Sequence, residues 1–316
     1  MATLYVDRQH AELRYRDRRL ELRVDGRLVQ ALPLSMLERV VVVQAASTDT
    51  RTLARLAAAG IGVSLLSGRG ADRALAVVGV AGNDARRRLA QYAAWHSDER
   101  RTELVRALLR LKLHAQYRLV RHVVRARPDR RVVLEKARRR ILALHAQLDH
   151  PAGDVDALRG IEGAASAAGF EALGAVMPPA LGFTGRRRRP APDPVNAVLS
   201  LGYTLAMGIA VETVHAAGLD PAIGYLHAPA HDRPSLALDV MEPLRPRIER
   251  MAWELFRKRR LTADHFRDRD GACLLGKAGR ALFYDEWESR QTAYRRWCRR
   301  LVMALVRRLQ EETSDG

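Results

Sequence analysis

The sequence lacks long apolar runs and is poor in cysteine, and both absences exclude whole classes of protein. No stretch approaches the roughly 18 to 20 uninterrupted apolar residues that span a bilayer, and the opening MATLYVDRQH lacks the apolar core of a signal peptide. Cys273 and Cys298 are too few for a disulfide framework and lack the CxxC spacing of a zinc knuckle. We therefore expect a cytoplasmic protein with no membrane association and two ordinary thiols.

Acidic residues are scarce relative to basic ones. The chain has 54 Lys+Arg against 36 Asp+Glu, a formal net charge of +18, and the excess is carried mainly by arginine. The planar guanidinium of arginine binds phosphate in a bidentate manner, which favours a nucleic acid partner over a membrane surface. A GC-rich coding bias would also replace lysine by arginine, so charge alone does not decide the partner.

Residues 1–82 have the pattern of strands. Apolar and charged residues alternate with a period of two, and Asp25-Gly26 predicts a hairpin turn. The apolar run Val40 to Val43 predicts a strand buried on both faces, and Thr50 to Ala59 predicts one helix. We expect a small, mostly β, sandwich-like N-terminal domain, with Ser67 to Gly70 forming a turn.

Residues 83–316 have the period of helices, so the 316-residue chain is expected to form two domains with an α+β fold overall. One buried stripe is predicted at Leu104, Leu108, Leu111, Ala115, Leu119 and Val123. Asp193-Pro194 predicts the start of a core helix that runs to Ala217. A last helix is predicted from about Glu286 to Glu312, with a core face of Trp287, Tyr294, Trp297, Leu301, Ala304 and Leu305. We expect this larger domain to be all-helical.

Basic residues concentrate on these predicted helices and on one loop. Residues 81–140 contain 18 Lys+Arg and 6 Asp+Glu, although a solvated basic face would give the same count. Arg186 to Arg189 stand between a glycine and a proline with no acid beside them. We predict that this loop, together with Arg245, binds the phosphate backbone of a nucleic acid, with a merely solvated loop as the alternative.

Glu162 is the first candidate for chemistry. In a helix over residues 156–169 it shares the apolar stripe of Leu158 and Ile161. An unpaired carboxylate on that face would be strongly destabilising, so it needs a cation, a hydrogen-bond network or protonation. A functional site and a buried Arg-Glu pair both satisfy this need.

His227 and the pair Asp239 and Glu242 are the other candidates. His227 follows the predicted core helix in GYLHAP, whereas we expect His231 to be an ordinary surface residue, because Pro229 prevents a shared helical face. Asp239 and Glu242, at i and i+3, would share one face of a helix, but the proline after Glu242 means either a helix start or a kink. Spacing therefore does not decide which acid points inward.

Two acids and one imidazole from separate segments form a mixed nitrogen and oxygen donor set. Such a set suits Mn²⁺ or Mg²⁺ rather than structural zinc. In a basic protein, a hard cation of this kind predicts phosphoryl transfer on nucleic acid.

Several segments resemble a known family. In this order the chain carries LRGIEG, RRRRPAPDPVNAVLSLGYT, GLDPAIGYLH and RPSLALDVMEPLRP, which resemble the helical domain of the CRISPR-associated integrase family, the universal first Cas protein. LYVDRQHAELRYRDRRLEL, LPLSMLERVVVV and AAAGIGVSLLSGRG are similar to the small β-domain of that family. The resemblance covers essentially the whole chain.

The resemblance implies a function and a ligand set. It implies that Glu162, His227 and Glu242 bind a divalent metal and that Asp239 is an auxiliary acid of the site. It also implies a homodimer, formed through the N-terminal domain, that joins a second small CRISPR-associated protein. Such a complex inserts captured double-stranded DNA fragments into a repeat array by transesterification. The chain departs from the family at Pro243 and Leu244, which leaves the three ligand positions intact but affects the local helix geometry.

Three alternatives stay open at this point. A plain metal-dependent nuclease would share the chemistry but lack the joining step. A non-catalytic nucleic acid scaffold would share only the basic surface, and a protein that binds membrane surfaces is a third, weaker possibility.

Overall fold

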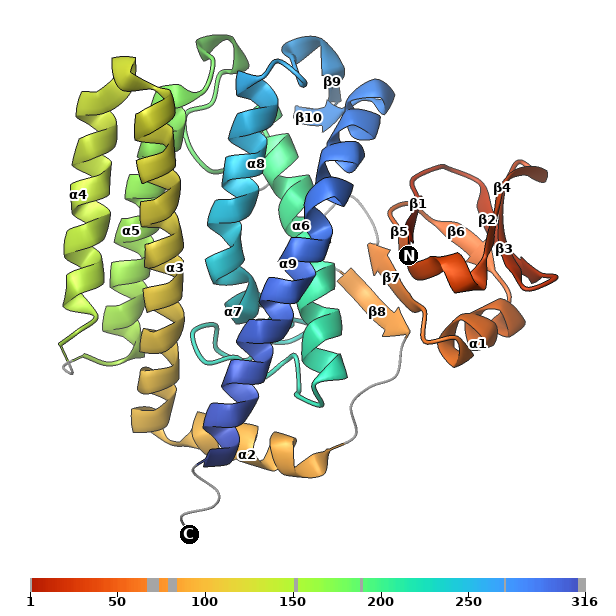
Figure 1. Cartoon of the computed structure of the whole chain (residues 1–316), viewed down its shortest axis with the longest axis horizontal. Helices are drawn as coiled ribbons and strands as arrows, with labels where there is room; N and C mark the ends of the chain where they lie inside the picture. The colour runs from red at the N-terminus through yellow and green to blue at the C-terminus, as the bar shows by residue number, and fades with distance from the viewer. Residues whose placement is uncertain are drawn as a thin grey trace.

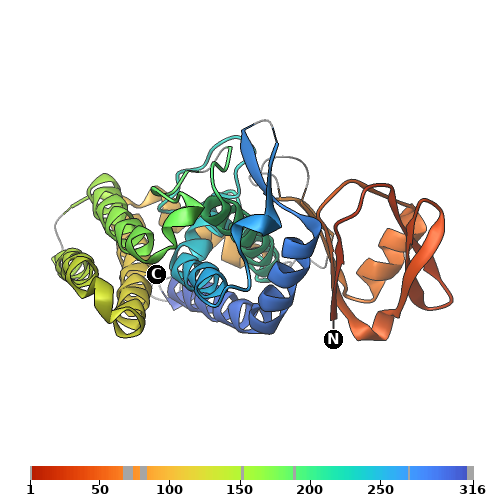
Figure 2. The ribbon, with the colours of Figure 1, turned by 90° about the horizontal axis from the view of Figure 1, so that it is seen from above.

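The chain folds into a strand-rich part and a larger helical part. The computed structural model describes residues 2–66, 74–78, 84–150, 153–187, 190–269 and 271–311. Figure 1 shows the two parts side by side, and from above the strand-rich part stands to one side of the helices (Figure 2). The predicted α+β class is confirmed. The predicted turn at 67–70 and the predicted boundary between residues 82 and 83 lie outside the described residues, so both stay predictions.

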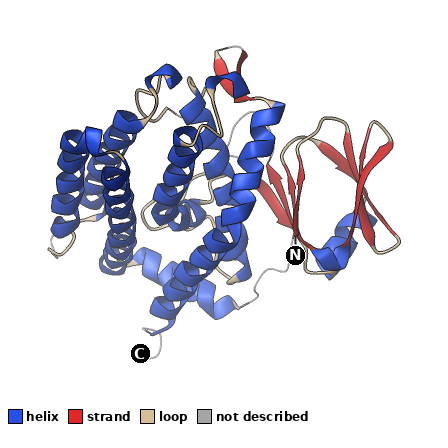
Figure 3. Ribbon diagram, turned by 45° about the horizontal axis from the view of Figure 1, so that its top comes forward, coloured by secondary structure: helices blue, strands red, loops and turns tan. Residues whose placement is uncertain are grey.

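In the described residues of the strand-rich part, two four-stranded sheets and one helix are present (Figure 3). The first sheet has the order β1-β5-β7-β8 and the second the order β4-β3-β2-β6. The elements are β1 (Ala2–Val6), β2 (Ala11–Arg16), β3 (Arg19–Val24), β4 (Arg27–Pro33), β5 (Leu37–Val42), β6 (Ala46–Thr48), α1 (Thr50–Ala58), β7 (Gly62–Leu66) and β8 (Ala74–Val78). A small apolar core lies between the sheets, as expected of a sandwich-like arrangement.

Strand β5 has apolar residues on both faces, as the run at Val40 to Val43 predicts. Val40 and Val42 belong to the small core, whereas Val41 belongs to the large core of the helical part. Successive side chains of a strand point to opposite faces, so one strand supplies both cores. This strand therefore fixes the strand-rich part against the helices.

The predicted hairpin turn is confirmed. Strands β3 and β4 pair antiparallel with Val24 opposite Arg27, and Asp25 and Gly26 between them have φ angles of 50° and 75°. Two successive positive φ angles belong to the tight turn that matches the twist of the flanking strands, and Asp-Gly is among its preferred pairs.

Eight helices account for most of the described residues after residue 84. They are α2 (Ala85–His96), α3 (Asp98–Ala126), α4 (Arg131–Gln147), α5 (Val155–Val176), α6 (Pro194–Ala216), α7 (Ser235–Met241), α8 (Arg245–Arg257) and α9 (Lys277–Glu311). In Figure 1 the helices α3, α4, α5 and α8 stand roughly side by side, and α2 lies across one end. Asp193 caps α6 through its side chain and Pro194 takes the first turn, as predicted.

Helix α6 is the core helix that its sequence predicts. Within the described residues it is the one helix long and apolar enough to cross a membrane, but 67% of its most apolar window is buried inside the protein. Val195 and Leu199 are fully buried at 0% exposure. The apolar length of α6 therefore reflects its place at the centre of the helical part.

The predicted stripe on α3 is right at its end, where Leu119 and Val123 are buried, and wrong in its first half. Its members Leu104 and Leu108 are only partly buried and Leu111 is 46% exposed. The buried face consists of Val105, Leu109, Lys112, Leu113, Gln116, Leu119, Val120 and Val123. Leucine and valine occupy two neighbouring faces of α3, so periodicity alone does not choose between them.

The prediction of an all-helical domain is also wrong in part. Strands β9 (Phe266–Arg269) and β10 (Ala272–Leu275) form a hairpin that precedes α9, visible as the separate red pair in Figure 3. Phe266 stacks on Phe256 of α8 with ring centroids 6.1 Å apart. Helix α9 begins directly after this hairpin at Lys277, well before the predicted start at Glu286.

Candidate functional site

His227 lies on the loop between α6 and α7, and close backbone packing holds this loop in place. A Cβ atom at Gly224 would lie 2.6 Å from the carbonyl oxygen of His227 and 2.6 Å from the carbonyl carbon of Ser235, so only glycine fits. Arg159 of α5 donates from Nε to the carbonyl oxygen of Leu226 at 2.9 Å. The loop is thus fixed from α5 as well as from its own ends.

Asp239 of α7 holds both the backbone and the ring of His227. Its carboxylate accepts the backbone N–H groups of Tyr225, Leu226 and His227 at 2.6, 3.1 and 3.0 Å. Its Oδ1 also lies 2.7 Å from Nδ1 of His227. Because this carboxylate acts as an acceptor throughout, Nδ1 is the donor, and in the neutral imidazole Nε2 is then the nitrogen with the free lone pair. Asp239 is therefore a residue that orients the imidazole.

Glu242 points inward from the break between two helices. Helix α7 ends at Met241, a 3-10 turn spans Glu242–Leu244, and α8 begins at Arg245. The turn places Pro243 where no regular α-helical hydrogen bond is lost. Asp239 and Glu242 are only 3% and 4% exposed, so both acids point inward. Nε2 of His227 lies 3.9 Å from Oε1 of Glu242.

Glu162 of α5 meets Glu242 through a lysine. Nζ of Lys112, on α3, donates to Oε1 of Glu162 and, at 2.5 Å, to Oε2 of Glu242. Ser166, one turn along α5, donates its hydroxyl to the same Glu162 oxygen at 2.7 Å. The two carboxylates thus share one ammonium group that is 2% exposed. Glu162 itself is 26% exposed, and Lys112 is the cation with which it pairs.

The charges of this cluster stabilise one another. Burial raises the pKa of Glu242, but the charges of Arg245 and Lys112 outweigh it and hold this pKa well below its usual value. Burial lowers the pKa of Lys112, but the charges of Glu242 and Glu162 raise it overall. Both Glu242 and Lys112 are therefore ionised at neutral pH.

A second layer of polar contacts surrounds Glu242. Nε of Arg245 donates to its Oε1 at 2.8 Å, and the guanidinium of Arg245 lies 4.7 Å from the ring centroid of Tyr203. The hydroxyl of Tyr203 donates to Oε1 of Glu249 at 2.8 Å. Burial raises the pKa of Glu249, whose carboxyl is 5% exposed.

The predicted phosphate-binding loop divides into three cases. Arg186 donates to Asn196 and Ser200 of α6 at 2.8 and 3.1 Å, so its guanidinium supports the loop itself. Arg187 is exposed, and Arg188 and Arg189 lie outside the described residues. Arg245 contacts Glu242, as described above. Phosphate binding by these arginines stays a prediction.

Sequence reasoning missed Lys112, although a signal was present. Once the buried face of α3 is known, LKLHAQ places a lysine within it, one position before Leu113 and four before Gln116. Lysine is almost never fully buried without a partner, so this position predicts a nearby carboxylate. The prediction for His231 was correct, because its side chain is 97% exposed.

The candidate ligands converge but do not form a finished metal site. Within the part of the chain that the structure describes, no three His, Cys, Asp or Glu side chains could hold a metal ion as they stand. The ammonium of Lys112 is the cation at the point where Glu162 and Glu242 meet. Glu242 and His227 are in mutual reach, and Glu162 is joined to them through Lys112.

The sequence comparisons agree on one family. The family model described as "CRISPR associated protein Cas1" matches residues 4–289. The chain is 32% identical to "CRISPR-associated endonuclease Cas1 1" of Thermodesulfovibrio yellowstonii over 99% of this chain and 98% of that protein. It is 34% identical to "CRISPR-associated endonuclease Cas1 2" of Rhodospirillum rubrum over 93% of this chain and 87% of that protein.

Solved structures show the same fold at lower identity. A CAS1 protein from Thermotoga maritima superposes with a TM-score of 0.80 at 21% identity, covering 98% of this chain and 97% of that one. A casposase bound to integration product also gives 0.80, at 17% identity over 100% and 92%. A Cas6-RT-Cas1--Cas2 complex gives 0.80 at 19% identity, covering 98% of this chain but 35% of that one.

Proposed function

The chain belongs to the Cas1 family of CRISPR-associated proteins, and on that premise we propose that it is a divalent-metal-dependent DNA endonuclease and integrase. Its substrate is DNA, and its specific reaction is the joining of a 3′-hydroxyl DNA end to a phosphodiester of a CRISPR array. The curated relatives named above are endonucleases, and the casposase of the same fold was solved with an integration product.

One observation carries the proposal. Glu162, His227 and Glu242 come from a helix, a loop and a helix break, yet Lys112 joins the two carboxylates and His227 Nε2 lies 3.9 Å from Glu242. Two carboxylates held this close, one of them buried, are destabilising unless a cation accompanies them. Such an arrangement in a basic protein is typical of phosphoryl-transfer sites.

The residues present fit a hard divalent cation. Two carboxylates and one imidazole are donors that Mn²⁺ and Mg²⁺ accept. The position of the Lys112 ammonium supports a cation-binding point between Glu162 and Glu242. A bound divalent ion would supply charge stabilisation at the scissile phosphate.

The protein's own residues have separate roles in the proposed reaction. Asp239 keeps the Nδ1 proton of His227 and thereby directs the Nε2 lone pair toward Glu242. Arg245 holds one oxygen of Glu242 at 2.8 Å and so fixes the rotation of that carboxylate. The charges of Lys112 and Arg245 keep Glu242 ionised without any bound ion.

The proposed partners follow from charge and from the relatives. The net charge of +18 suits the DNA backbone, which the exposed arginines would hold without reading bases. We propose a homodimer that joins a second small protein of the Cas2 type, because a neighbour of this fold was solved as a Cas1--Cas2 complex. The N-terminal strand-rich domain is the proposed dimerisation region, and the compartment is the cytoplasm.

A nuclease assay with matched glutamate variants tests the proposal. Glu162→Ala and Glu242→Gln should each reduce Mn²⁺-dependent cleavage of double-stranded DNA by about 10²-fold or more, since each removes a proposed ligand. Glu171→Gln, at an exposed position of the same helix α5, is the control and should cleave like the parent. DNA affinity should be unchanged in all three. If the two site variants retain full cleavage, the metal site is wrong, and if the parent binds DNA but never cleaves it, the protein is a scaffold.

A strand-transfer assay separates the integrase from a plain nuclease. A labelled fragment with a free 3′-hydroxyl is incubated with supercoiled plasmid carrying a repeat array, in the presence of the second small protein. Joining of label to plasmid supports the integrase. Cleavage without joining would leave a plain metal-dependent nuclease.

A further inference from the structure

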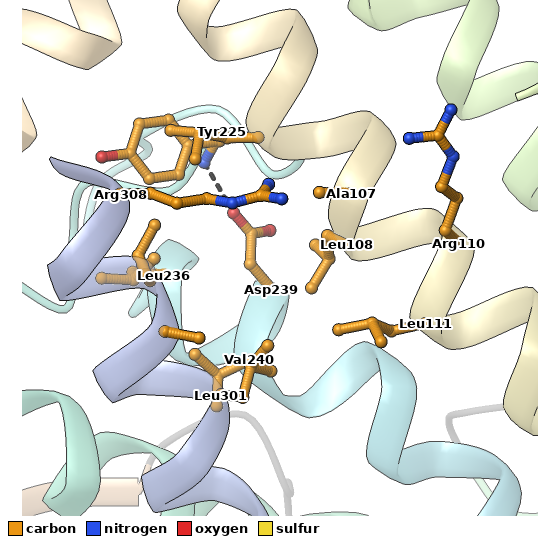
Figure 4. Close-up of a pocket in the computed structure, with 13 residues that line it drawn as sticks. Ala107, Leu108, Arg110, Leu111, Tyr225, Leu236, Asp239, Val240, Leu301 and Arg308 are labelled. Atoms are coloured by element: carbon orange, nitrogen blue, oxygen red, sulfur yellow. Dashed lines mark hydrogen bonds between the residues drawn. The ribbon is translucent and has the colours of Figure 1, made fainter. Parts of the chain in front are cut away.

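An apolar groove lies between α3, α7 and α9. It is separate from Lys112, Glu162 and Glu242, which are called the carboxylate cluster from here on. The volume of the groove is about 350 Å³. Leu108 and Leu111 of α3 line one side and Leu301 of α9 the other, and Leu236 and Val240 of α7 complete the apolar lining (Figure 4). The lining is mainly apolar, with Arg110, Asp239 and Arg308 among its polar members.

The groove is built from the two apolar stripes that the sequence predicts to be core. Leu104, Leu108 and Leu111 come from α3, and Leu301, Ala304 and Leu305 come from α9. The true core faces of both helices lie beside these stripes, for example at Val105 and Val302. Both stripes have helical spacing suited to burial, yet Leu111 is 46% exposed and the other members are only partly buried. Contiguous apolar side chains left partly exposed in this way mark an interaction surface.

The groove is ill suited to DNA. Phosphate gains nothing from leucine, and bases stack on exposed rings. Among the described lining residues the one aromatic is Tyr225, which is 3% exposed. An apolar partner surface is therefore the better match.

Basic side chains border the groove. Arg308 of α9 and Arg110 of α3 are both exposed lining residues. Arg110 also donates to the carbonyl oxygen of Leu148 and to Asp149 at 3.0 and 3.2 Å, so Arg308 is the stronger candidate for a partner's acid. The acid among the lining residues, Asp239, already accepts backbone N–H groups and His227. A partner with acidic residues flanking its apolar face would complement this border.

A second copy of this chain matches the groove poorly. The chain carries a net charge of +18, and its outer helix α4 presents Arg131, Arg139 and Arg140 to solvent. Docking such a helix would bring basic residues against Arg110 and Arg308.

We propose that the groove receives an amphipathic helix of another protein, with apolar residues on one face and acidic residues beside them. The apolar side chains of α3 and α9 on opposite sides of the groove would accept such a helix in the manner of helix-in-groove recognition. The docked helix lies against α7, which carries Asp239 and so orients His227.

A model peptide tests this assignment with the full chain. The probe is a fluorescein-labelled 18-residue peptide with leucine at i, i+3, i+4 and i+7 spacing and glutamate on both flanks. A second peptide has the same composition in scrambled order, so that its charge is identical. Fluorescence anisotropy at physiological salt should give at least tenfold tighter binding for the patterned peptide.

Matched substitutions locate the binding. Leu111→Gln, at a 46% exposed position, and Arg308→Gln should each weaken the patterned peptide about threefold to tenfold. Val132→Gln, at an 86% exposed position of α4, and Arg139→Gln on the same helix remove the same groups elsewhere and should leave the affinity unchanged.

Three results would overturn the proposal. Equal binding of the patterned and scrambled peptides would show only charge attraction. Equal losses in the α4 variants would place the peptide elsewhere. A lower oligomeric mass of Leu111→Gln in light scattering would show that the groove joins copies of this chain. None of these readouts depends on metal or on cleavage, so they are independent of the nuclease proposal.

Discussion

The carboxylate cluster and the apolar groove share two helices but differ in how their side chains are satisfied. On α3, Lys112 is 2% exposed and contacts two carboxylates, whereas the preceding residue, Leu111, is 46% exposed and lines the groove. Asp239 of α7 reaches both regions.

This difference separates internal from external function. The cluster is a set of charges that pair with one another inside the protein. Substitutions in it should therefore lower both the free energy of unfolding and the activity. The groove is apolar surface that stays partly exposed in the folded protein. Substitutions in it should therefore change only the affinity for a partner. Neighbouring residues on one helix can therefore be compared directly.

The largest effect is expected at Lys112. Lys112→Met removes the cation shared by Glu162 and Glu242, and it should lower the free energy of unfolding by about 3–5 kcal/mol. Leu111→Gln, the adjacent control, should change it by less than about 0.5 kcal/mol. Urea denaturation without metal measures both. Saturating Mn²⁺ should restore part of the loss in Lys112→Met, because the ion binds only the folded state. Equal free energies of unfolding for the two variants would contradict the claim that Lys112 stabilises the fold and Leu111 does not.

A smaller effect is expected at Asp239. Asp239→Asn keeps the size of the side chain but weakens the carboxylate contact that orients His227, so the Kd for Mn²⁺ should rise about 10- to 100-fold. Calorimetric titration of Mn²⁺ measures this change. Asp232→Asn, at a side chain that is 75% exposed, is the control and should bind as the parent does. An unchanged Kd in Asp239→Asn would mean that the imidazole needs no orienting carboxylate.

The smallest effect is expected at Glu249 and depends on pH. Burial raises the pKa of Glu249 in the folded state. The protein is therefore most stable at a pH below the pKa of Glu249 in the unfolded chain, where the carboxyl is protonated in both states. It loses stability as the pH rises toward and through the pKa of Glu249 in the folded state. Glu249→Gln keeps an acceptor for Tyr203 and removes this loss. It should therefore be more stable than the parent at pH 7, and the difference should shrink toward zero as the pH falls to about 4, near the pKa of an unfolded glutamate. Denaturation at the two pH values checks this, and a constant difference would show that Glu249 does not titrate in this range.

Much of the fold follows from local sequence signals. The Asp25-Gly26 turn, the doubly buried β5 and the Asp193-Pro194 start of α6 all depend on neighbouring residues only. Local rules of this kind survive in the folded protein because tertiary packing does not oppose them. The three acids and His227 were also visible, because their residue types and segments are unusual in an apolar setting.

The rest depends on contacts between distant elements. Lys112 lies 50 residues from Glu162 and 130 from Glu242, and no local pattern pairs them. Helix α3 has leucine on two faces, so its own sequence does not decide which face is buried. The packing of α5 and α8 against α3 decides it. The β9-β10 hairpin was missed because its strands have only four residues each.

Anomalous diffraction from Mn²⁺-soaked crystals is the most direct measurement of the metal site. We expect one manganese peak within normal ligand distance of the carboxylates of Glu162 and Glu242 and of Nε2 of His227, with the Lys112 ammonium moved away from at least one carboxylate. A Lys112 ammonium still bridging both carboxylates, with manganese bound only elsewhere or not at all, would contradict the proposed site.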